Sequence, residues 1–399
     1  MIMAPRVDIS FTQPNADRSW YVRAVGPTRG DIQAYGKTHI YLGGLAVDTK
    51  ANRSRTITVE TATQFSLVNP RTGATKTVDA PKGATISAPA WSPDGKSIAF
   101  MANFEDASYA YLLDVASGKL AQVSKAPLLA TLHMSLEFTA DGKSLVAVVI
   151  PDNRGPAPTH GPNGIEDGPT VRMTNSRAVP TPVYWSLLLD PHEKAQLKYY
   201  TTGQLVVMDI AKKTVKKVGE PRIIRAVEAS PDAQYFTVTS MTEPFSYLVP
   251  VSSFGSVREL WDANGKVIAT LQTTPLREGA TDDGGDAPAG GRGGAQQSAS
   301  DTGKRNVAWN PVGPGLVYVQ SVFSAAAGGG AAAPAAGGRG GRGGRAGAPG
   351  GAPGRPAPTS VQYVNWLPPF GPTDTKVIYE GSGQLGTIAY GTDGKTLFA

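Results

Sequence analysis

The chain has 399 residues, of which 40% are hydrophobic and 18% charged, with 47 Gly, 32 Pro and no Cys. The absence of cysteine excludes disulfides, cysteine-ligated zinc and a thiol nucleophile. Low charge with abundant Gly and Pro favours many short strands joined by tight turns. The net charge of +6 says little about function, because four of the positive charges sit in one Gly/Ala/Pro-rich stretch, at Arg339, Arg342, Arg345 and Arg355, and the rest of the chain is close to neutral.

No segment is typical of export or of a membrane span. Residues 1–6 contain no apolar signal-peptide core, and the longest apolar run, near residues 145–150, is far too short to cross a bilayer. We therefore expect a soluble chain.

A turn followed by an alternating strand recurs along the chain. Complete or degenerate copies of a Ser-Pro-Asp-Gly-Lys turn and its strand occupy residues 90–100, 137–148, 228–239, 308–319 and 390–398. Pro fixes φ at the first turn position, Asp bonds back to the backbone, and Gly accepts a positive φ. Asp94 and Asp141 are 47 residues apart, which is close to one four-stranded propeller blade.

A second kind of hairpin lies near most copies and predicts the outer two strands of each blade, at residues 65–75, 110–120, 205–215 and 259–268. A single hairpin would also suit a β-sandwich, but repetition near blade spacing favours a propeller. The prediction is an all-β fold, with residues 1–399 forming an incomplete β-propeller domain. Five blades are expected at residues 7–78, 84–123, 132–218, 223–271 and 306–379, with a partial sixth from residue 385. Because that blade stops in mid-strand, we expect a truncated chain.

Three segments interrupt the repeats. Residues 152–196 form an insertion within the third blade, with a short helix expected within residues 184–198, and either a binding loop or a surface excursion explains it. Residues 276–303 and 325–358 are flexible by composition and contain Gly-Arg-Gly-Gly. Arg-Gly repeats also occur in RNA-binding tails, but no aromatic residue is interleaved from 325 to 358, which favours a loop over a nucleic-acid site.

The chain carries none of the searched catalytic motifs. No serine has glycine two positions away on both sides, as a nucleophile elbow requires; at Ser382 those positions hold Glu380 and Gln384. No phosphate-binding loop and no His-Glu-x-x-His pair is present. We predict no catalytic, cofactor-binding or metal-binding residue, and no cofactor.

The histidines and the turn aspartates are expected to be structural. His133 is predicted on a strand, either facing a central channel or, as is commoner, hydrogen-bonded in the interior; His192 is predicted at a solvated helix start. The separation of the four histidines argues against a metal site; the other two are His39 and His160. Local backbone bonding accounts for the turn carboxylates Asp94, Asp141 and Asp232.

Three longer stretches resemble a known family. Residues 125–135 (KAPLLATLHMS), residues 187–205 (from LLLDPHE to YYTTGQL) and residues 243–262 (from EPFSYLVP to VRELWD) are similar to the N-terminal propeller of the glutamyl endopeptidase group, within the prolyl oligopeptidase (S9) family of serine peptidases. The resemblance covers residues 84–271 well and the remainder weakly.

The resemblance implies a seven-bladed propeller capping an α/β-hydrolase domain that carries a Ser, Asp and His triad and cleaves after glutamate. The propeller would admit peptides or unfolded segments and exclude folded proteins. Expected partners are therefore a peptide or unfolded protein substrate and the missing α/β-hydrolase domain, with no nucleic acid. The full protein is expected to be periplasmic or secreted, with the cytoplasm left open.

Two functions are weighed from the sequence. The preferred one is the substrate-gating portion of a serine endopeptidase that is not catalytic by itself. The alternative is a non-catalytic periplasmic propeller that binds a protein partner. We also expect the isolated chain to be poorly soluble, because stacked repeats need capping or ring closure.

Overall fold

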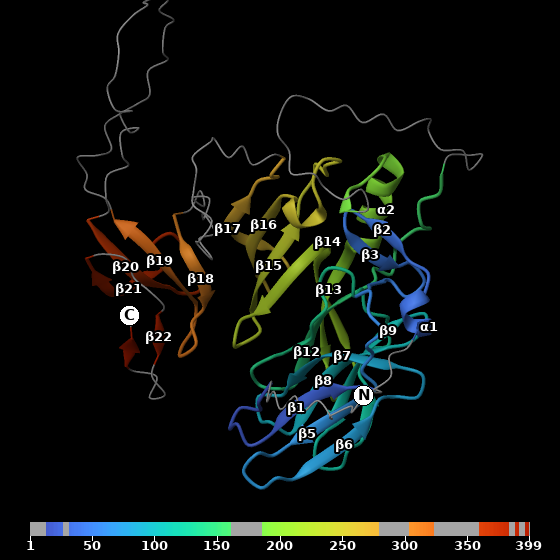
Figure 1. Ribbon diagram of the computed structural model, residues 1–399. Coiled ribbons are helices and arrows are strands. Elements are labelled where there is room, and N and C mark those ends of the chain that lie inside the picture. The colour runs from blue at the N-terminus through green and yellow to red at the C-terminus, as the bar shows by residue number, and fades with distance from the viewer. Residues whose placement is uncertain are drawn as a thin grey trace, which may run out of the picture. The chain divides into compact units, whose positions relative to one another are not determined.

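A computed structural model describes residues 13–26, 32–160, 186–278, 303–322, 359–382, 388–390 and 396–398 (Figure 1). The chain divides into two compact units, Met1–Ser298 and Ala299–Ala399, and each is described by itself. Antiparallel strands in sequential order build almost all of both units, as the sequence predicts for the blades of a propeller.

The first two blades lie at the start of the first unit. One sheet has the strand order β1-β5-β6, and the next has the order β10-β9-β8-β7. An isolated bridge pairs Pro14 with Tyr21 at the place where the innermost strand of the first blade is expected. The strands are β1 (Tyr21–Val25), β5 (Gln64–Val68), β6 (Thr75–Asp79), β7 (Thr85–Trp91), β8 (Ser97–Asn103), β9 (Ser108–Asp114) and β10 (Leu120–Gln122).

The third and fourth blades share one strand. β14 pairs with β13 as the outer strand of the third blade, then continues without a loop to pair with β15 as the inner strand of the fourth. The strands are β11 (Glu137–Phe138), β12 (Ser144–Val149), β13 (Thr202–Asp209), β14 (Val215–Ala229), β15 (Tyr235–Met241), β16 (Ser256–Asp262) and β17 (Val267–Thr274).

A small extra sheet departs from the single first blade predicted over residues 7–78. It consists of β2 (Ile40–Leu42), β3 (Leu45–Asp48) and β4 (Arg53–Ser54), and we call it the strap sheet. Its first hairpin turns through Gly43 and Gly44, whose φ values of +59° and +90° suit a two-residue turn that only glycine adopts readily. Helix α1 (Ile32–Gly36) precedes it.

The helix expected in the third-blade insertion is α2 (Pro191–Thr201). The Asp190 side chain caps it by accepting a hydrogen bond from the Glu193 N–H at 2.8 Å, and Pro191 occupies the first turn, where no N–H is needed. A single 3₁₀ turn, Val251–Ser253, lies in the connection between β15 and β16.

The second unit contains one four-stranded sheet and a two-stranded one. The strands are β18 (Arg305–Trp309), β19 (Leu316–Val322), β20 (Ser360–Trp366), β21 (Thr375–Gly381), β22 (Ala389–Tyr390) and β23 (Leu397–Phe398). Val317, Val319 and Tyr363 of the larger sheet pack with Ile388 and Leu397 beside the smaller.

The packing of the second blade confirms the propeller fold. Along β8, Ile98, Phe100 and Ala102 pack against the first blade, while the alternate residues Ala99 and Met101 pack against the third. Because side chains alternate across a strand, β8 is buried on both faces by successive sheets. A further cluster joins the third and fourth blades in the same way through Val148, Phe236 and Trp261, among others. Sheets stacked face to face in chain order are the defining contact of a propeller.

Candidate binding face

The connections between strands differ sharply at the two ends of the blades. The first and second strands of each blade, and the third and fourth, are joined by tight turns such as residues 92–97 and 114–119. The second and third strands are joined by residues 26–63, 104–107, 150–201 and 242–255 in the first unit, and by residues 323–359 in the second. In the first unit the long connections between second and third strands therefore lie at one end of the blades, which we call the loop-bearing face. Binding residues concentrate on such loops when a rigid scaffold holds them.

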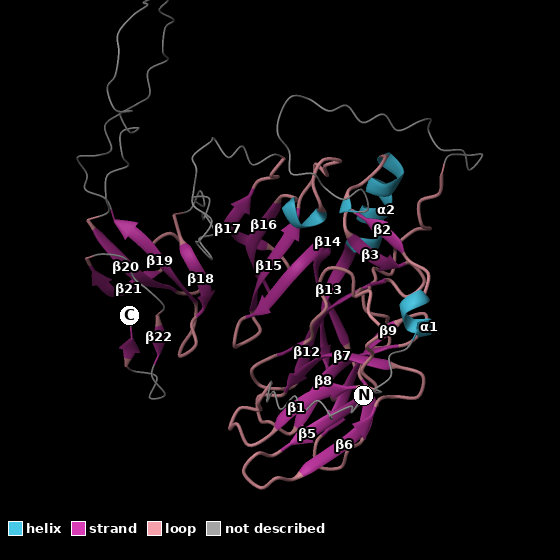
Figure 2. Ribbon diagram, viewed as in Figure 1, coloured by secondary structure: helices cyan, strands magenta, loops and turns pink. Residues whose placement is uncertain are grey.

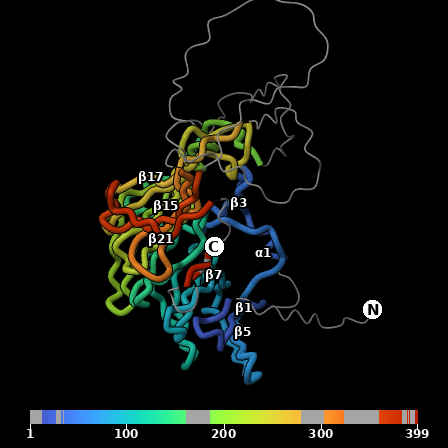
Figure 3. Tube along the Cα trace, turned by 90° about the vertical axis from the view of Figure 1, so that its left-hand side faces the viewer, coloured from blue at the N-terminus to red at the C-terminus, as the bar shows by residue number. Residues whose placement is uncertain are grey.

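The strap sheet ties the loop-bearing face of the first unit together. The Ser54 N–H donates to the Ala130 carbonyl at 2.8 Å, and the Val251 N–H donates to the Gly43 carbonyl at 2.9 Å. These bonds link the sheet to connections of the third and fourth blades. Beneath it lies an apolar cluster that includes Leu42, Val47, Leu188, Leu197, Tyr200, Ile223, Phe245 and Phe254. Figure 2 shows α2 beside β2, and Figure 3 gives the first unit in a second view.

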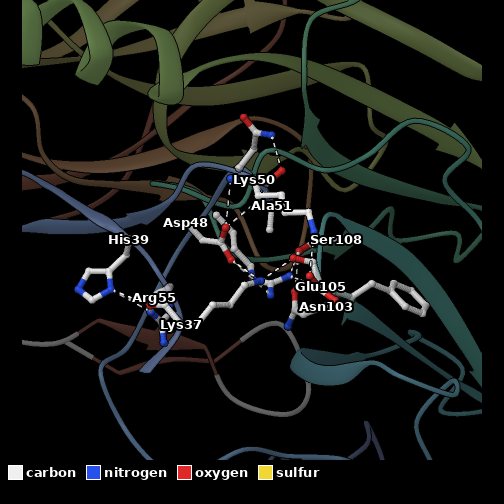
Figure 4. Close-up of polar contacts among 12 residues, drawn as sticks. Lys37, His39, Asp48, Lys50, Ala51, Arg55, Asn103, Glu105 and Ser108 are labelled. Carbon is white, nitrogen blue, oxygen red and sulfur yellow. Dashed lines mark hydrogen bonds and ion pairs between the residues drawn. The ribbon is translucent and has the colours of Figure 1, made fainter. Parts of the chain in front are cut away.

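Asp48 at the end of β3 is the buried centre of a polar cluster (Figure 4). Its side chain is 2% exposed, and its Oδ2 lies 2.7 Å from Nζ of Lys37 and 3.9 Å from Nη2 of Arg53. Its Oδ1 accepts hydrogen bonds from the backbone N–H groups of Lys50 and Ala51 at 3.1 and 3.0 Å. A carboxylate so enclosed stays charged only because these partners replace water.

The electrostatics of the cluster favour the fully ionised state. Burial alone would raise the pKa of Asp48, but Lys37, the Ala51 N–H and Arg53 hold it below its usual value. Burial lowers the pKa of Arg53, and the negative charge of Asp48 partly offsets this by raising it.

The strap sheet is also anchored on the second blade. Arg53 Nη1 donates to the Phe104 carbonyl at 2.7 Å and to the Ser108 hydroxyl at 3.3 Å. Lys50 Nζ pairs with Glu105 at 2.8 Å. The strap sheet therefore makes polar contacts with three successive blades.

Arg55 and His39 lie on another side of Asp48. Figure 4 shows Arg55 and His39 on one side of Asp48 and Glu105 on the opposite side. Arg55 Nη1 lies 2.9 Å from Nδ1 of His39 and also donates to the Lys37 carbonyl, while Nη2 donates to the Tyr35 carbonyl at 3.2 Å. These contacts orient the guanidinium.

A further guanidinium stands beside α2. Arg154 Nη2 donates to the Asn52 side chain at 2.6 Å, and its Cζ lies 4.3 Å from the centre of the Tyr199 ring. Cation–aromatic stacking of this kind stabilises a charge that has few water contacts.

The third and fourth blades meet at a partly buried carboxyl group. Glu137 Oε2 on β11 accepts a hydrogen bond from the Ala229 N–H on β14 at 3.1 Å. Burial raises the pKa of Glu137 to about 7; the Ala229 N–H lowers it in part, and the nearby Glu228 raises it further. The protonated state is therefore populated near neutral pH.

The turn aspartates occupy the places that the sequence predicts. Asp94 accepts hydrogen bonds from the Ser92 hydroxyl at 2.6 Å and from the Lys96 N–H at 3.1 Å. Asp141 and Asp232 make the corresponding bonds in the next two blades. Ser382 follows β21 and is exposed, and its neighbours from 383 to 387 lie outside the described residues.

The histidines differ in part from expectation. The strand predicted for His133 is wrong: the residue lies in the irregular connection before β11, where it is 8% exposed and its Nε2 is 3.3 Å from the Ser135 hydroxyl. Burial lowers the pKa of His133. His160 and His192, far apart in sequence, stack with ring centres 3.8 Å apart. Within the described ranges, no three His, Asp or Glu side chains are grouped to hold a metal ion.

The Asp48 cluster was not found by sequence reasoning. The signal available was a run of apolar residues, Leu45-Ala46-Val47, ending in an aspartate and followed by Lys50, Arg53 and Arg55. Such a pattern marks a buried charge only once its distant partners are known.

Sequence comparison places the chain among known proteins. It is 28% identical over 333 residues to a probable chloroplastic glutamyl endopeptidase of Oryza sativa subsp. japonica, which covers 80% of this chain and 33% of that protein. A protein of the same description from Arabidopsis thaliana is 28% identical over 206 residues, which cover 50% of this chain and 21% of that protein. Both of these similar proteins are described as probable glutamyl endopeptidases. The family resemblance predicted from the sequence is confirmed, and the chain spans a third or less of the length of these relatives.

No family model matches the sequence. Among solved structures, the chain is similar to the acylaminoacyl peptidase of Pyrococcus horikoshii, with 17% identity, a TM-score of 0.33 and coverage of 57% of this chain and 30% of that one. The chain is also similar to the β-propeller domain of the Trilobed protease of Pyrococcus furiosus, with 16% identity and a TM-score of 0.31. This match covers 52% of this chain and 48% of that one. At such TM-scores the likenesses do not bear on function.

Among the helices that the structure describes, none has the length and apolar character needed to cross a membrane.

Proposed function

We propose that this chain is the substrate-access portion of a serine endopeptidase that cleaves after glutamate. The 333-residue relationship to a probable glutamyl endopeptidase carries the proposal. The loop-bearing face supports it, because a rigid stack of blades that gathers its long connections at one end can filter what passes that end.

The catalytic step is assigned to an α/β-hydrolase domain outside this chain. A glutamyl peptide or an unfolded segment reaches that domain, while a folded protein is too wide to pass the propeller. The chain itself contains no nucleophile elbow, so its own residues bind, orient and exclude rather than react.

The test compares this chain with the complete translation product of its gene. We expect the complete product to react with a fluorophosphonate probe and to hydrolyse an Ala-Ala-Glu substrate faster than the matched Ala-Ala-Gln substrate. A complete product that neither reacts nor hydrolyses would favour the partner-binding propeller instead.

Access control is measured with one cleavable sequence in two contexts. The glutamyl sequence is offered as a short peptide and within a loop of a stable folded domain. We expect cleavage of the peptide alone; equal cleavage of both would contradict the access role.

Export to the periplasm or the exterior stays a prediction, which fractionation of the source cells decides.

A further inference from the structure

An arginine of the fourth blade reaches the loop-bearing face. Arg225 lies in the second half of β14, which is the inner strand of that blade, and inner strands lie nearest the axis around which blades are arranged. Its Nη2 donates to the Val251 carbonyl and lies 3.2 Å from the Met241 sulfur. Val251 belongs to the connection 242–255, and its own N–H donates to Gly43 of the strap sheet. The guanidinium therefore lies beside the long connections.

A β-bulge sets the position of Arg225. Ile224 of β14 lies opposite Ser240 of β15. The next pair along the ladder is Ala226 with Thr239, which leaves Arg225 as an extra residue. An extra residue bends the strand and takes its side chain out of the regular alternation, and bulges of this kind often direct a functional side chain.

The positive charge of Arg225 has no carboxylate partner among the residues that the structure describes. Glu228, three positions further along β14, is 2.9 Å from Nη2 of Arg258 and so belongs to another ion pair. Burial lowers the pKa of Arg225, and no described carboxylate raises it in return, as Asp48 does for Arg53. A guanidinium that has lost part of its water and has no counter-charge is stabilised by an anionic ligand.

The imidazole beside Arg225 adds no second charge. His133 is 8% exposed and is hydrogen-bonded to the Arg225 backbone. Burial lowers the pKa of His133, so its ring is neutral near neutral pH. A single guanidinium matches the single negative charge of a carboxylate, whereas phosphate groups are typically bound by clusters of arginines. The expected ligand group is therefore a carboxylate.

Arg225 keeps hydrogen-bond donors for such a ligand. Both of its contacts use Nη2, while Nε and Nη1 have no partner among the described residues and are not enclosed. We propose that Arg225 binds a carboxylate of a polypeptide at the loop-bearing face through these N–H groups. That the carboxylate belongs to a polypeptide rests on the proposed function. Two sources share this chemistry, an acidic side chain and a C-terminus, and the test distinguishes them.

The test measures binding of unlabelled tetrapeptides to the 399-residue chain by isothermal titration calorimetry. Acetyl-Ala-Ala-Glu-Ala-amide carries a side-chain carboxylate, and acetyl-Ala-Ala-Gln-Ala with a free C-terminus carries a terminal one. Acetyl-Ala-Ala-Gln-Ala-amide carries neither. We expect a charged peptide to bind about tenfold or more tightly than the neutral one, because hydrogen bonds between charged groups are the stronger ones. The charged peptide with the higher affinity identifies the source of the carboxylate.

Variants separate a binding role of Arg225 from a structural one. Arg225→Gln keeps an amide donor for the Val251 carbonyl but removes the charge. It should weaken the charged peptide about tenfold and leave the neutral peptide unchanged, whereas Arg225→Lys should retain part of the preference. The matched control is Arg222→Gln on the same strand, whose Nη1 lies 3.5 Å from Glu259, and it should bind as the unmodified chain does. Circular dichroism and urea unfolding verify the fold of each variant.

Two results would overturn the proposal: no preference of the unmodified chain for either charged peptide, or an equal effect of Arg225→Gln on charged and neutral peptides. The first comparison needs no variant, so it decides even where Arg225→Gln does not fold. Hydrolysis does not enter this assay, whereas the proposed function is judged on hydrolysis by the complete gene product. Failure of the carboxylate site is therefore distinguishable from failure of the proposed function.

Discussion

Substituting Glu137 with Gln tests the partly buried carboxyl group between the third and fourth blades. The pKa of Glu137 is about 7, against an ordinary value of 4.5. The folded state therefore binds this proton more tightly than the unfolded state, and the associated stability is present below about pH 4.5 and is lost as the pH rises through 7. Each pKa unit corresponds to 1.36 kcal/mol, so the free energy of unfolding that is lost approaches about 3 kcal/mol at pH 8.

The Glu137→Gln variant would keep a carbonyl oxygen for the Ala229 N–H and remove the charge. We expect it to unfold at a similar urea concentration to the parent chain at about pH 4, and to be more stable by up to about 3 kcal/mol at pH 8. Urea unfolding followed by tryptophan fluorescence and by circular dichroism measures this. The control is Glu60→Gln at an exposed position. The same stability difference at both pH values would refute the reasoning.

Four further outcomes are expected. Asp48→Asn should destabilise the chain by roughly 3 kcal/mol in urea, because it leaves Lys37 without its buried partner; an effect below that of the exposed Asp94→Asn would contradict this. Phe100→Ala, which empties a fully buried site beside Phe65, should cost about 3–5 kcal/mol by the same assay. Asp232→Ala should cost about 1 kcal/mol through lost turn bonds, and a neutral result would count against the capping role. The chain by itself should not be labelled by a fluorophosphonate probe, and labelling would reveal a nucleophile that its sequence does not show.

Local chemistry explains which parts of the fold were predictable. The turns at Ser92, Thr139 and Ser230 are stabilised by hydrogen bonds between residues that lie within six positions of one another. The local sequence therefore predicts them directly. The alternation along β8 likewise follows from residues that are adjacent in the chain.

Long-range contacts explain what was missed. The strap sheet lies in sequence between two strands of the first blade, and alternation alone does not tell which sheet a strand joins. The charged state of Asp48 depends on Lys37 and Arg53, and the position of the strap sheet depends on contacts with Glu105 and Ala130. No local sequence pattern connects these residues. His133 sits in an apolar stretch typical of a strand, yet the chain there runs irregularly toward β11.

The unbroken course of β14 limits how the first unit can deform. Because one strand serves both the third and fourth blades, these two cannot separate without breaking its ladder to β13 or β15. Elsewhere the blades are joined by irregular chain, at residues 80–84 between the first and second and at residues 123–136 between the second and third. Backbone rotations are cheap only in such irregular segments. We therefore expect relative movement of the blades in the first unit to occur at those two joints rather than between the third and fourth blades.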